Sequence, residues 1–398
     1  MRLTSPALAA TLPALLAGTT LSMAERFDVP ANFTSIQAAI GAANPGDEIV
    51  VAAGEYSGPI RIDKAVTVRS QAGAGQTTLR GNGGSPVVTM ESTDGQGGTL
   101  AGFTVTGGGG ENGGGLFLAG DVAVVDCNVT GNSAQNGGGA FLLGSPMLNR
   151  VHFEANSASA GGAVFLGPDA DALMDNCAFT ANEAQLGGAL YVGPGRDGNT
   201  FATIGAGSFE SNTADEGGAI MAVMSGFEAG QSTFSRNTSW MKGGAVRLVG
   251  STPCALTECT MSLNESDTWG GAVDMSEQSD LYVAGCEVSQ NTAQAAGGGF
   301  EIEPGSALAV VASTLWGNQP GNFEGVWEDL GDNSFAQPPA CDADLAAPFG
   351  VLDMADILAF VSAFAAEDAA ADFAAPEGLF DLRDVIEFIN QYFAGCAR

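Results

Sequence analysis

Three charged residues at one repeat position have types and spacing that could do chemistry. They end the phrases GGAVR, GGAVD and GGGFE, at Arg247, Asp274 and Glu301. If they lie on adjacent strands, Asp274 and Glu301 are like charges about 4.8 Å apart. Such a pair is unfavourable unless a cation or a shared proton relieves it. Trp240 and Trp269 fall in the turns beside this position.

Three interpretations of this cluster are open. Aromatic rings beside paired carboxylates suit a carbohydrate, and the carboxyl groups of retaining glycosidases are about 5 Å apart. Asp274, Glu301 and Arg247 are therefore candidate catalytic residues. The same residues could instead form a binding or cation site. In the third interpretation they are a solvated surface ladder, with Arg247 and Asp274 as an ordinary cross-strand ion pair.

The elements that must position these residues belong to a repeat that covers most of the chain. Its copies, such as CNVTGNSAQNGGGAF and CEVSQNTAQAAGGGFE, align on one asparagine and recur every 24 to 30 residues. The anchors are Asn132, Asn156, Asn182, Asn212, Asn237, Asn264, Asn291 and Asn318. A repeat of this length indicates a unit that cannot bury its apolar face alone and stacks on its neighbours.

The periodicity within each copy indicates strands. After the glycine pair, buried and variable positions alternate, as in Val246, Arg247 and Leu248, which is typical of a strand with one buried face. Helical repeats need ten or more residues at a 3.6 period, and the glycine-rich turns leave no room for them. We therefore predict an all-β fold, a parallel β-helix solenoid, whose anchor asparagines stack their side-chain amides in a structural ladder along the axis.

The variable position after the glycine pair should form one outward column. Its first half is aromatic and its second half charged: Phe117, Phe141, Phe165, Tyr191, Met221, Arg247, Asp274 and Glu301. Aromatic residues stacked on neighbouring strands commonly stabilise a sheet. The alternative is a platform that binds a carbohydrate or a protein partner, to which Trp240 and Trp269 would contribute.

The N-terminal residues and the composition indicate an exported protein. Arg2 precedes an apolar run over residues 7–21, and small residues at Ser22 and Ala24 suit signal-peptide cleavage, so residues 1–24 are expected to be a signal peptide. The chain has 45 acidic and 13 basic residues, a net charge of −32. This charge argues against nucleic acid and anionic membrane surfaces as partners. No later apolar run is long enough for a membrane span.

A short helix is expected to close the N-terminal end of the stack. In TSIQAAIGAANPGDEIVVAAGEY, Ser35 can cap a helix. The residues expected to share its apolar face are Ile36, Ala39, Ile40 and Ala43. This phrase resembles the entry of right-handed parallel β-helix proteins of the pectin-lyase-like fold, in which a capping helix leads into the first coil. The resemblance implies a right-handed solenoid over residues 25–335.

The resemblance leaves the activity open. Proteins of this fold include pectate lyases, polygalacturonases and pectin methylesterases, and also adhesins and surface proteins without activity. The Gly-His-Gly triplet of polygalacturonase-like sites is absent from the sequence. We expect a secreted or surface-anchored, non-catalytic protein that binds a polysaccharide or a protein partner. The alternatives are a polysaccharide lyase or glycoside hydrolase, and a structural adhesin without a site.

After a proline-containing linker at residues 336–340, residues 341–398 have a helical pattern. DLAAPFGVLDMADILAFVSAF from Asp344 and DFAAPEGLFDLRDVIEFINQYF from Asp372 form a repeat of 28 residues, in which an acidic loop opens an amphipathic helix. The two halves can pack face to face. Cys341 and Cys396 bracket the pair, and we expect a disulfide between them in an exported module of this size.

This module resembles a dockerin, of the divergent kind found on secreted proteins of planctomycete-type bacteria. Each dockerin loop is an EF-hand-like calcium site, and the candidate ligands are Asp353, Asp356, Asp372, Glu377, Asp381 and Asp384. The first loop departs from the pattern, because Ala346, Ala347 and Pro348 offer no side-chain oxygen and calcium takes six to eight oxygens. The resemblance implies calcium as a cofactor and a cohesin-like or envelope protein as a partner.

Overall fold

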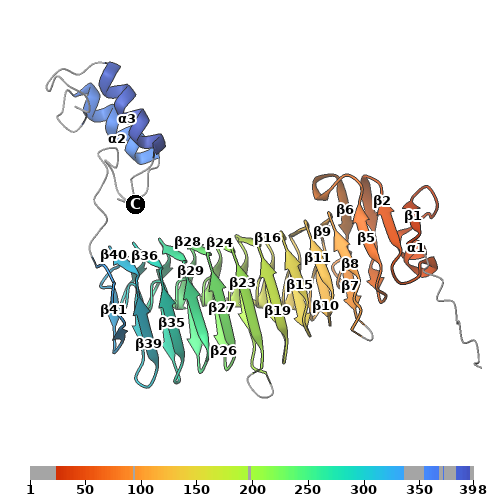
Figure 1. Ribbon diagram of the computed structural model, residues 1–398, viewed down its shortest axis with the longest axis horizontal. Coiled ribbons are helices and arrows are strands. Elements are labelled where there is room, and N and C mark those ends of the chain that lie inside the picture. The colour runs from red at the N-terminus through yellow and green to blue at the C-terminus, as the bar shows by residue number, and fades with distance from the viewer. Residues whose placement is uncertain are drawn as a thin grey trace, which may run out of the picture.

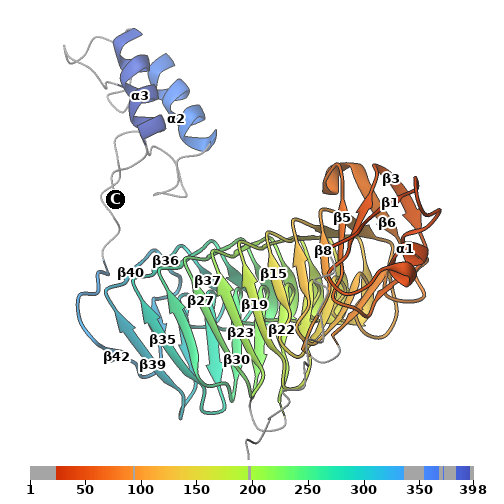
Figure 2. The same ribbon diagram turned by 45° about the vertical axis from the view of Figure 1, so that its right-hand side comes forward.

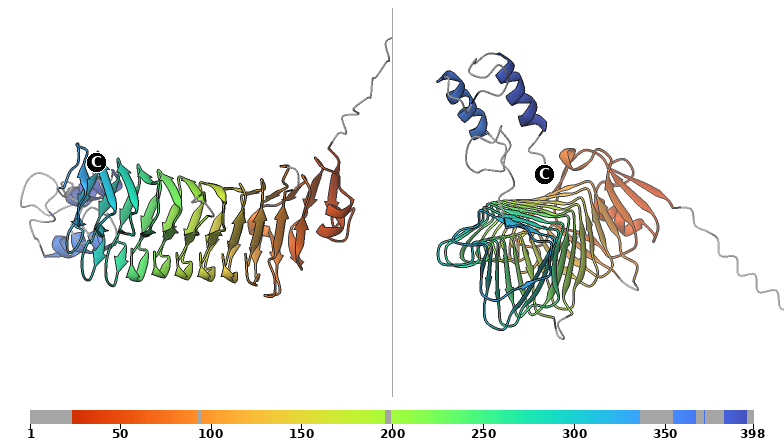
Figure 3. Two further views of the ribbon diagram at one scale, coloured as in Figure 1. Left: turned by 90° about the horizontal axis from the view of Figure 1, so that it is seen from below. Right: turned by 60° about the vertical axis from the view of Figure 1, so that its left-hand side comes forward.

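The computed structural model of the protein describes residues 24–92, 95–195, 199–335, 354–366, 371 and 382–394. Most of these residues form a parallel β-solenoid whose coils stack along one axis (Figures 1 and 2). Viewed more nearly along that axis, the coils lie one behind another (Figure 3, right). The strand pairs in the four described sheets are parallel. The predicted fold class, an all-β parallel solenoid, is confirmed.

Each full coil passes through four sheets in turn, numbered here in the order in which the chain meets them. Sheet 1 has 13 strands, in the order β1 (Arg26–Val29), β2 (Glu48–Val51), β5 (Thr67–Ser70), β8 (Thr99–Ala101), β11 (Ala123–Val125), β15 (Met147–Asn149), β19 (Asp171–Asp175), β23 (Phe201–Gly205), β27 (Gly226–Gly230), β31 (Cys254–Thr257), β35 (Asp280–Ala284), β39 (Ala307–Val311) and β42 (Glu328–Asp329).

Sheet 2 has 11 strands, β3 (Gly54–Ser57), β6 (Thr77–Arg80), β9 (Thr104–Thr106), β12 (Asn128–Thr130), β16 (His152–Glu154), β20 (Ala178–Thr180), β24 (Ser208–Glu210), β28 (Thr233–Ser235), β32 (Thr260–Ser262), β36 (Glu287–Ser289) and β40 (Thr314–Trp316). A short 3₁₀ turn, η1 (Ala74–Gln76), precedes β6.

Sheet 3 is shorter, with seven strands, β13 (Ser133–Asn136), β17 (Ser157–Ala160), β21 (Glu183–Leu186), β25 (Thr213–Glu216), β29 (Thr238–Lys242), β33 (Glu265–Ser266) and β37 (Thr292–Ala293). Sheet 4 again has 11, β4 (Ile60–Ile62), β7 (Val88–Glu91), β10 (Leu116–Ala119), β14 (Ala140–Leu143), β18 (Val164–Leu166), β22 (Leu190–Val192), β26 (Ile220–Val223), β30 (Val246–Val249), β34 (Val273–Ser276), β38 (Phe300–Ile302) and β41 (Phe323–Glu324).

The anchor asparagines form a continuous buried ladder at the turn between sheets 2 and 3. Each side-chain amide from Asn132 to Asn291 donates to the side-chain oxygen of the next anchor at 2.8–3.1 Å. That same oxygen also accepts the backbone N–H of the preceding anchor. At the C-terminal end, the Asn318 amide donates instead to Asn322 of its own turn at 2.8 Å. Buried amides are tolerated here because their hydrogen bonds are made.

The glycine pair permits the sharp turn from sheet 3 into sheet 4. Gly243 has a φ of +67°, a conformation that residues with a side chain rarely adopt. A Cβ atom on Gly244 would lie 2.1 Å from the carbonyl oxygen of Gly271. The two backbones can approach this closely only because position 244 has no side chain.

A short helix lies at the N-terminal end of the core, and two aromatic side chains pack against its C-terminal end. Helix α1 (Ile36–Ala42) lies at the N-terminal end (Figure 1), capped by Ser35, whose hydroxyl accepts the N–H of Ala38 at 3.2 Å. The apolar face expected for this helix is buried: Ile36, Ala39, Ile40 and Ala43. At the other end, Phe323 and Trp327 pack against the core with their ring centroids 4.1 Å apart.

Two further helices belong to the C-terminal region, α2 (Met354–Ala365) and α3 (Leu382–Ala394). They pack through Phe360 and Phe388, whose rings stack at 4.0 Å. Val361 and Ile389, each next in sequence to one of these phenylalanines, are exposed. None of the helices in the described part of the chain is long and apolar enough to cross a membrane.

Candidate functional site

The variable position after the glycine pair forms one in-register column on sheet 4. Strand pairing joins Phe117, Phe141, Phe165, Tyr191, Met221, Arg247, Asp274 and Glu301 as direct neighbours, in that order. The alternating strands also turn these side chains away from the core, in which the flanking Leu, Val and Met residues are buried. The repeat alignment therefore predicts the order of this column along the solenoid axis.

The aromatic half of the column is a stack of rings. The centroids of Phe117 and Phe141 are 5.7 Å apart, those of Phe141 and Phe165 are 5.2 Å apart, and those of Phe165 and Tyr191 are 4.9 Å apart. The interplanar angles are 10° to 20°. Phe141, in the middle, is only 8% exposed because its neighbours cover both faces. This geometry fits ring stacking between coils better than a platform open to a ligand.

The charged half is also covered, contrary to the interpretation as a solvated ladder. Asp274 is 0% exposed and Arg247 is buried. A Cβ atom on Gly270 would lie 2.7 Å from the Cβ of Asp274, so the turn between sheets 3 and 4 lies directly against this side chain. The prediction of a solvent-exposed charge ladder is wrong for Arg247 and Asp274, because period-two alternation cannot show that a turn closes over the outer face.

Arg247 joins two carboxylates within the covered column. Its Nη1 donates to Oδ1 of Asp274, and its Nε donates to Oε2 of Glu216 at 3.2 Å. Glu216 ends β25 of sheet 3, so these contacts tie sheet 3 to sheet 4. The guanidinium of Arg247 balances the negative charge of Asp274, which would otherwise be costly to bury.

Two carboxylate oxygens in this cluster have no hydrogen-bond partner among the residues that the structure describes. Oδ2 of Asp274 and Oε2 of Glu301 are both buried and unpaired. Burial raises the pKa of Asp274 to about 6, although the cations of Arg247 and Lys242 oppose the rise. Burial also raises the pKa of Glu301 to about 7, and repulsion from Asp274 adds to this effect. A buried acid with a pKa near neutrality is a feature of functional sites and also of structural charge networks.

The two tryptophans flank this cluster from the sheet 3 side. Lys242 donates to Oε1 of Glu303 at 2.6 Å, and its ammonium lies 5.0 Å from the ring centroid of Trp269. Trp240 is 59% exposed and Trp269 is 40% exposed. Between β25 and β29 the register shifts by one residue, at the position of Trp240 and Met241. These rings are accessible, whereas Asp274 is not.

The candidate metal ligands of the C-terminal region fall mostly outside the described residues. This holds for Asp353, Asp372, Glu377 and Asp381, for the side chain of Asp356, and for Cys341 and Cys396. Asp384 lies in the first turn of α3 and is buried. Among the residues that the structure describes, no three His, Cys, Asp or Glu side chains are grouped so that they could hold a metal ion.

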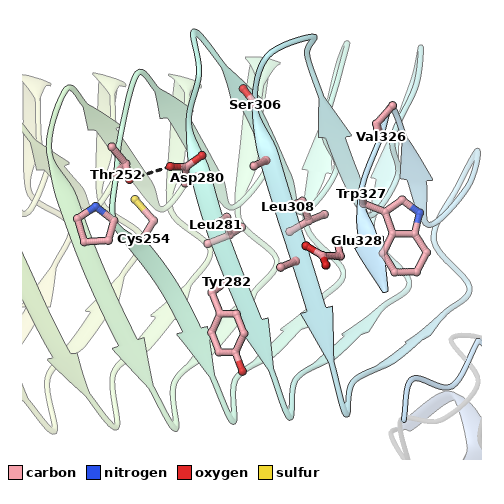
Figure 4. Close-up of a pocket in the computed structure, with 13 residues that line it drawn as sticks. Thr252, Cys254, Asp280, Leu281, Tyr282, Ser306, Leu308, Val326, Trp327 and Glu328 are labelled. Atoms are coloured by element: carbon pink, nitrogen blue, oxygen red, sulfur yellow. Dashed lines mark hydrogen bonds between the residues drawn. The ribbon is translucent and has the colours of Figure 1, made fainter. Parts of the chain in front are cut away.

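A pocket of about 500 Å³ lies on the outer face of sheet 1 near the C-terminal end of the solenoid, and no sequence pattern pointed to it. In Figure 4, Asp280 and Tyr282 border it from β35, and Trp327 and Glu328 border it from the last strand and the segment before it. Strand register places Ala309 between Tyr282 and Glu328. The hollow forms because an alanine stands between two long side chains.

The rim of this pocket carries polar groups and an exposed ring. Tyr282 is 43% exposed. The hydroxyl of Thr252 donates to Oδ2 of Asp280 at 3.1 Å across the neighbouring strands. Trp327 stacks on Phe323, so one face of its indole is already covered. The alternation of Asp280, Leu281 and Tyr282 could have indicated that Tyr282 points outward. That Ala309 lies beside Tyr282 follows only from the pairing of the coils.

The comparisons with known proteins give no family for this chain. No protein-family model matches the sequence, and no curated protein is significantly similar to it.

Proposed function

We propose that the protein is an exported, non-catalytic binding protein that holds a polysaccharide in the pocket on sheet 1. The pocket of about 500 Å³ carries the proposal. Its volume lies within the range of about 300–1,000 Å³ that is usual for ligand sites. The exposed ring of Tyr282 offers an apolar face to a sugar ring, while Thr252, Asp280 and Glu328 offer hydrogen-bonding groups to its hydroxyls.

The charges around the pocket restrict the class of polysaccharide. Asp280 and Glu328 line the pocket, and none of its described lining residues is basic. The whole chain carries a net charge of −32. Carboxylates repel an anionic ligand, so a polysaccharide rich in uronic acids or sulfates fits poorly. Neutral glycans and glycans with free amino groups fit this site.

Glycan binding by the full chain tests the proposal. An array of neutral, amino-bearing and acidic polysaccharides identifies the ligand, and titration calorimetry then measures its affinity for each variant. Tyr282→Ala should weaken binding about tenfold or more, because a stacked aromatic anchor commonly contributes more than 1 kcal/mol. Trp240→Ala is the matched control, since it removes an exposed ring outside the pocket and should leave the affinity unchanged.

Two results would contradict the proposal. Binding that is lost in Trp240→Ala and kept in Tyr282→Ala would move the site to the tryptophans beside the charged column. Absence of binding to every glycan class would favour a protein partner or a structural adhesin.

A polysaccharide lyase or glycoside hydrolase is the second candidate, and Glu301 is the observation that favours it. A pKa of about 7 suits a general acid at neutral pH. Against it, a glycosidase needs two carboxyl groups that reach the sugar, and Asp274 is fully buried. We expect no reducing sugar and no unsaturated product from acidic or neutral polysaccharides. Turnover that disappears in Glu301→Gln would establish the enzyme instead.

The C-terminal region is proposed to attach the protein to a cohesin-like or envelope partner, with calcium bound in its loops. The stacked pair Phe360 and Phe388 supports the packing of two amphipathic halves that a dockerin-like module needs. Asp384, buried in the first turn of α3, is at the position where an EF-hand-like loop ends. Calorimetric titration of the full chain with CaCl₂ tests the calcium sites, and absence of binding heat at millimolar calcium would reject them.

A further inference from the structure

Asp274 and Glu301 carry their carboxyl groups on two neighbouring coils, and one oxygen of each is buried. The residues are direct partners in the pairing of β34 with β38. Oδ1 of Asp274 accepts a hydrogen bond from Arg247, while Oδ2 accepts none. Oε2 of Glu301 is likewise buried without a partner. Two ionised carboxylates cannot hydrogen-bond to each other, because both are acceptors only, but an acid and a carboxylate can.

The surrounding charges do not neutralise this pair. The groups that face it or act on it from the adjoining elements are Glu216 of β25, Lys242 of β29, Arg247 of β30, Glu303 after β38 and Glu324 of β41. Arg247 is shared between Glu216 and Asp274, and Lys242 is bonded to Glu303. Counting the pair itself, five acidic groups face two cations. With all five acids ionised the cluster has three more negative than positive charges, and one bound proton would reduce this excess to two.

We propose that Asp274 and Glu301 form a proton-binding site, in which a single proton shared by the two carboxyl groups holds the coil of β34 against the coil of β38. The proton sits on one carboxyl group and is donated to an oxygen of the other, so both unpaired oxygens become satisfied. Loss of the proton leaves two negative charges about 4.8 Å apart with little water between them. The site takes up its proton in mildly acidic solution and releases it in mildly alkaline solution.

The direction of the pH effect follows from the pKa values. Burial holds the pKa of Glu301 at about 7 and that of Asp274 at about 6, both above their ordinary values near 4. A group whose pKa is raised by folding binds more protons in the folded than in the unfolded state. Its contribution to stability is full below about pH 4 and is lost as the pH rises through about 6 to 7. The two coils should therefore loosen above neutral pH.

The proton site lies in the same two coils as the pocket on sheet 1. Three residues, 277–279, join β34 to β35, which carries Tyr282. Four residues, 303–306, join β38 to β39, which carries Ala309. Proton release at Asp274 and Glu301 would therefore act on strands that are directly connected to the pocket. The proton site itself does not depend on which ligand the pocket binds.

Hydrogen–deuterium exchange of the full chain at several pH values tests this site. Protection factors, which remove the intrinsic pH dependence of exchange, are measured for peptides that cover β34 and β38. In the wild-type protein we expect protection of these peptides to fall at least severalfold between about pH 5.5 and 8. In Glu301→Gln, whose amide donates to Asp274 at every pH, we expect the fall to disappear.

Matched controls separate this site from the many other acidic groups. Glu265→Gln removes one negative charge from an exposed position on the coil of Asp274, and should leave the wild-type pH dependence in place. Asp274→Asn should abolish it, as Glu301→Gln does. Equal falls in the wild type and Glu301→Gln would overturn the proposal. So would a gain in protection at pH 8 on adding CaCl₂ to the wild type but not to Glu301→Gln, since the pair would then hold a metal ion.

Discussion

The two halves of the column on sheet 4 occupy equivalent positions in the same repeat and are stabilised by different interactions. In the first half, Phe117, Phe141 and Phe165 stack their rings from coil to coil. In the second half, Arg247 and Asp274 form a buried ion pair, and Glu301 continues the row with an unpaired oxygen. Met221 lies between the halves, paired with Tyr191 on one side and Arg247 on the other.

This difference shows that the backbone of the repeat restricts the environment of a side chain in the column but not its chemical type. The turn between sheets 3 and 4 covers part of the outer face of the column, where Phe141, Met221, Arg247 and Asp274 are buried, so a side chain there must be satisfied without much water. Stacked rings meet this demand by dispersion and apolar burial, which do not depend on pH. Charged groups meet it only through partners and protons, so the second half gains pH sensitivity that the first half lacks.

Removing the central cation should be the most damaging change in the column. Arg247→Ala leaves Asp274 buried without the cation to which it is hydrogen-bonded, and loss of one partner of a buried pair costs about 3–5 kcal/mol. Urea unfolding at pH 8 should show this loss. At pH 5 the loss should be smaller, because Asp274 can then take up a proton.

Arg236→Ala is the control for this substitution. Arg236 makes an exposed ion pair with Glu210 at 3.8 Å, and such pairs contribute about 0–1 kcal/mol. A loss of similar size in the two variants would show that the burial of Arg247 has no energetic consequence.

Breaking the aromatic stack should have the next largest effect. Phe141→Ala should lower the free energy of unfolding by about 2–3 kcal/mol, somewhat less than the ~3–5 kcal/mol of a core phenylalanine, because the ring lies on an outer face. Its cost should be the same at pH 5 and pH 8. Phe141→Leu keeps most of the apolar burial and loses only the ring contacts, so about 1 kcal/mol is expected. A cost of Phe141→Ala that changes with pH would remove the contrast between the two halves.

The smallest effect is expected for an aromatic ring that lies next to the column but is not covered. Trp240 is 59% exposed, and surface substitutions usually change stability by less than about 0.5 kcal/mol. Trp240→Ala should therefore leave the urea midpoint almost unchanged. A loss comparable with that of Phe141→Ala would mean that the exposed ring is part of the stack.

The sequence carried enough information for the architecture and for the order of residues along the axis. The asparagine and glycine-pair spacing predicts the ladder, the parallel pairing and the neighbours of Asp274, because a solenoid repeats one local conformation. It did not predict that Asp274 is buried. Alternation assigns a side chain to one face of a strand, but whether that face is covered depends on the path of the next turn, here at Gly270.

The pocket on sheet 1 could not be predicted for a related reason. It results from Ala309 standing between Tyr282 and Glu328 on three successive coils. Each residue is unremarkable in its own copy of the repeat, and the last coil departs from the repeat pattern. Only the pairing of coils, which sets long side chains beside a short one, creates the hollow.

The asparagine ladder restricts the length of the solenoid to a whole number of coils. Every anchor amide donates one hydrogen atom toward the C-terminal end, where Asn322 accepts the last one, and its other hydrogen atom to a backbone carbonyl of the preceding coil. If a complete coil were removed or duplicated, each amide donor would still face an acceptor. If only part of a coil were removed or added, one buried amide would lose its hydrogen-bond partner. Evolution or protein design can therefore shorten or lengthen the solenoid only by whole coils, and Asn322 must remain as the last acceptor.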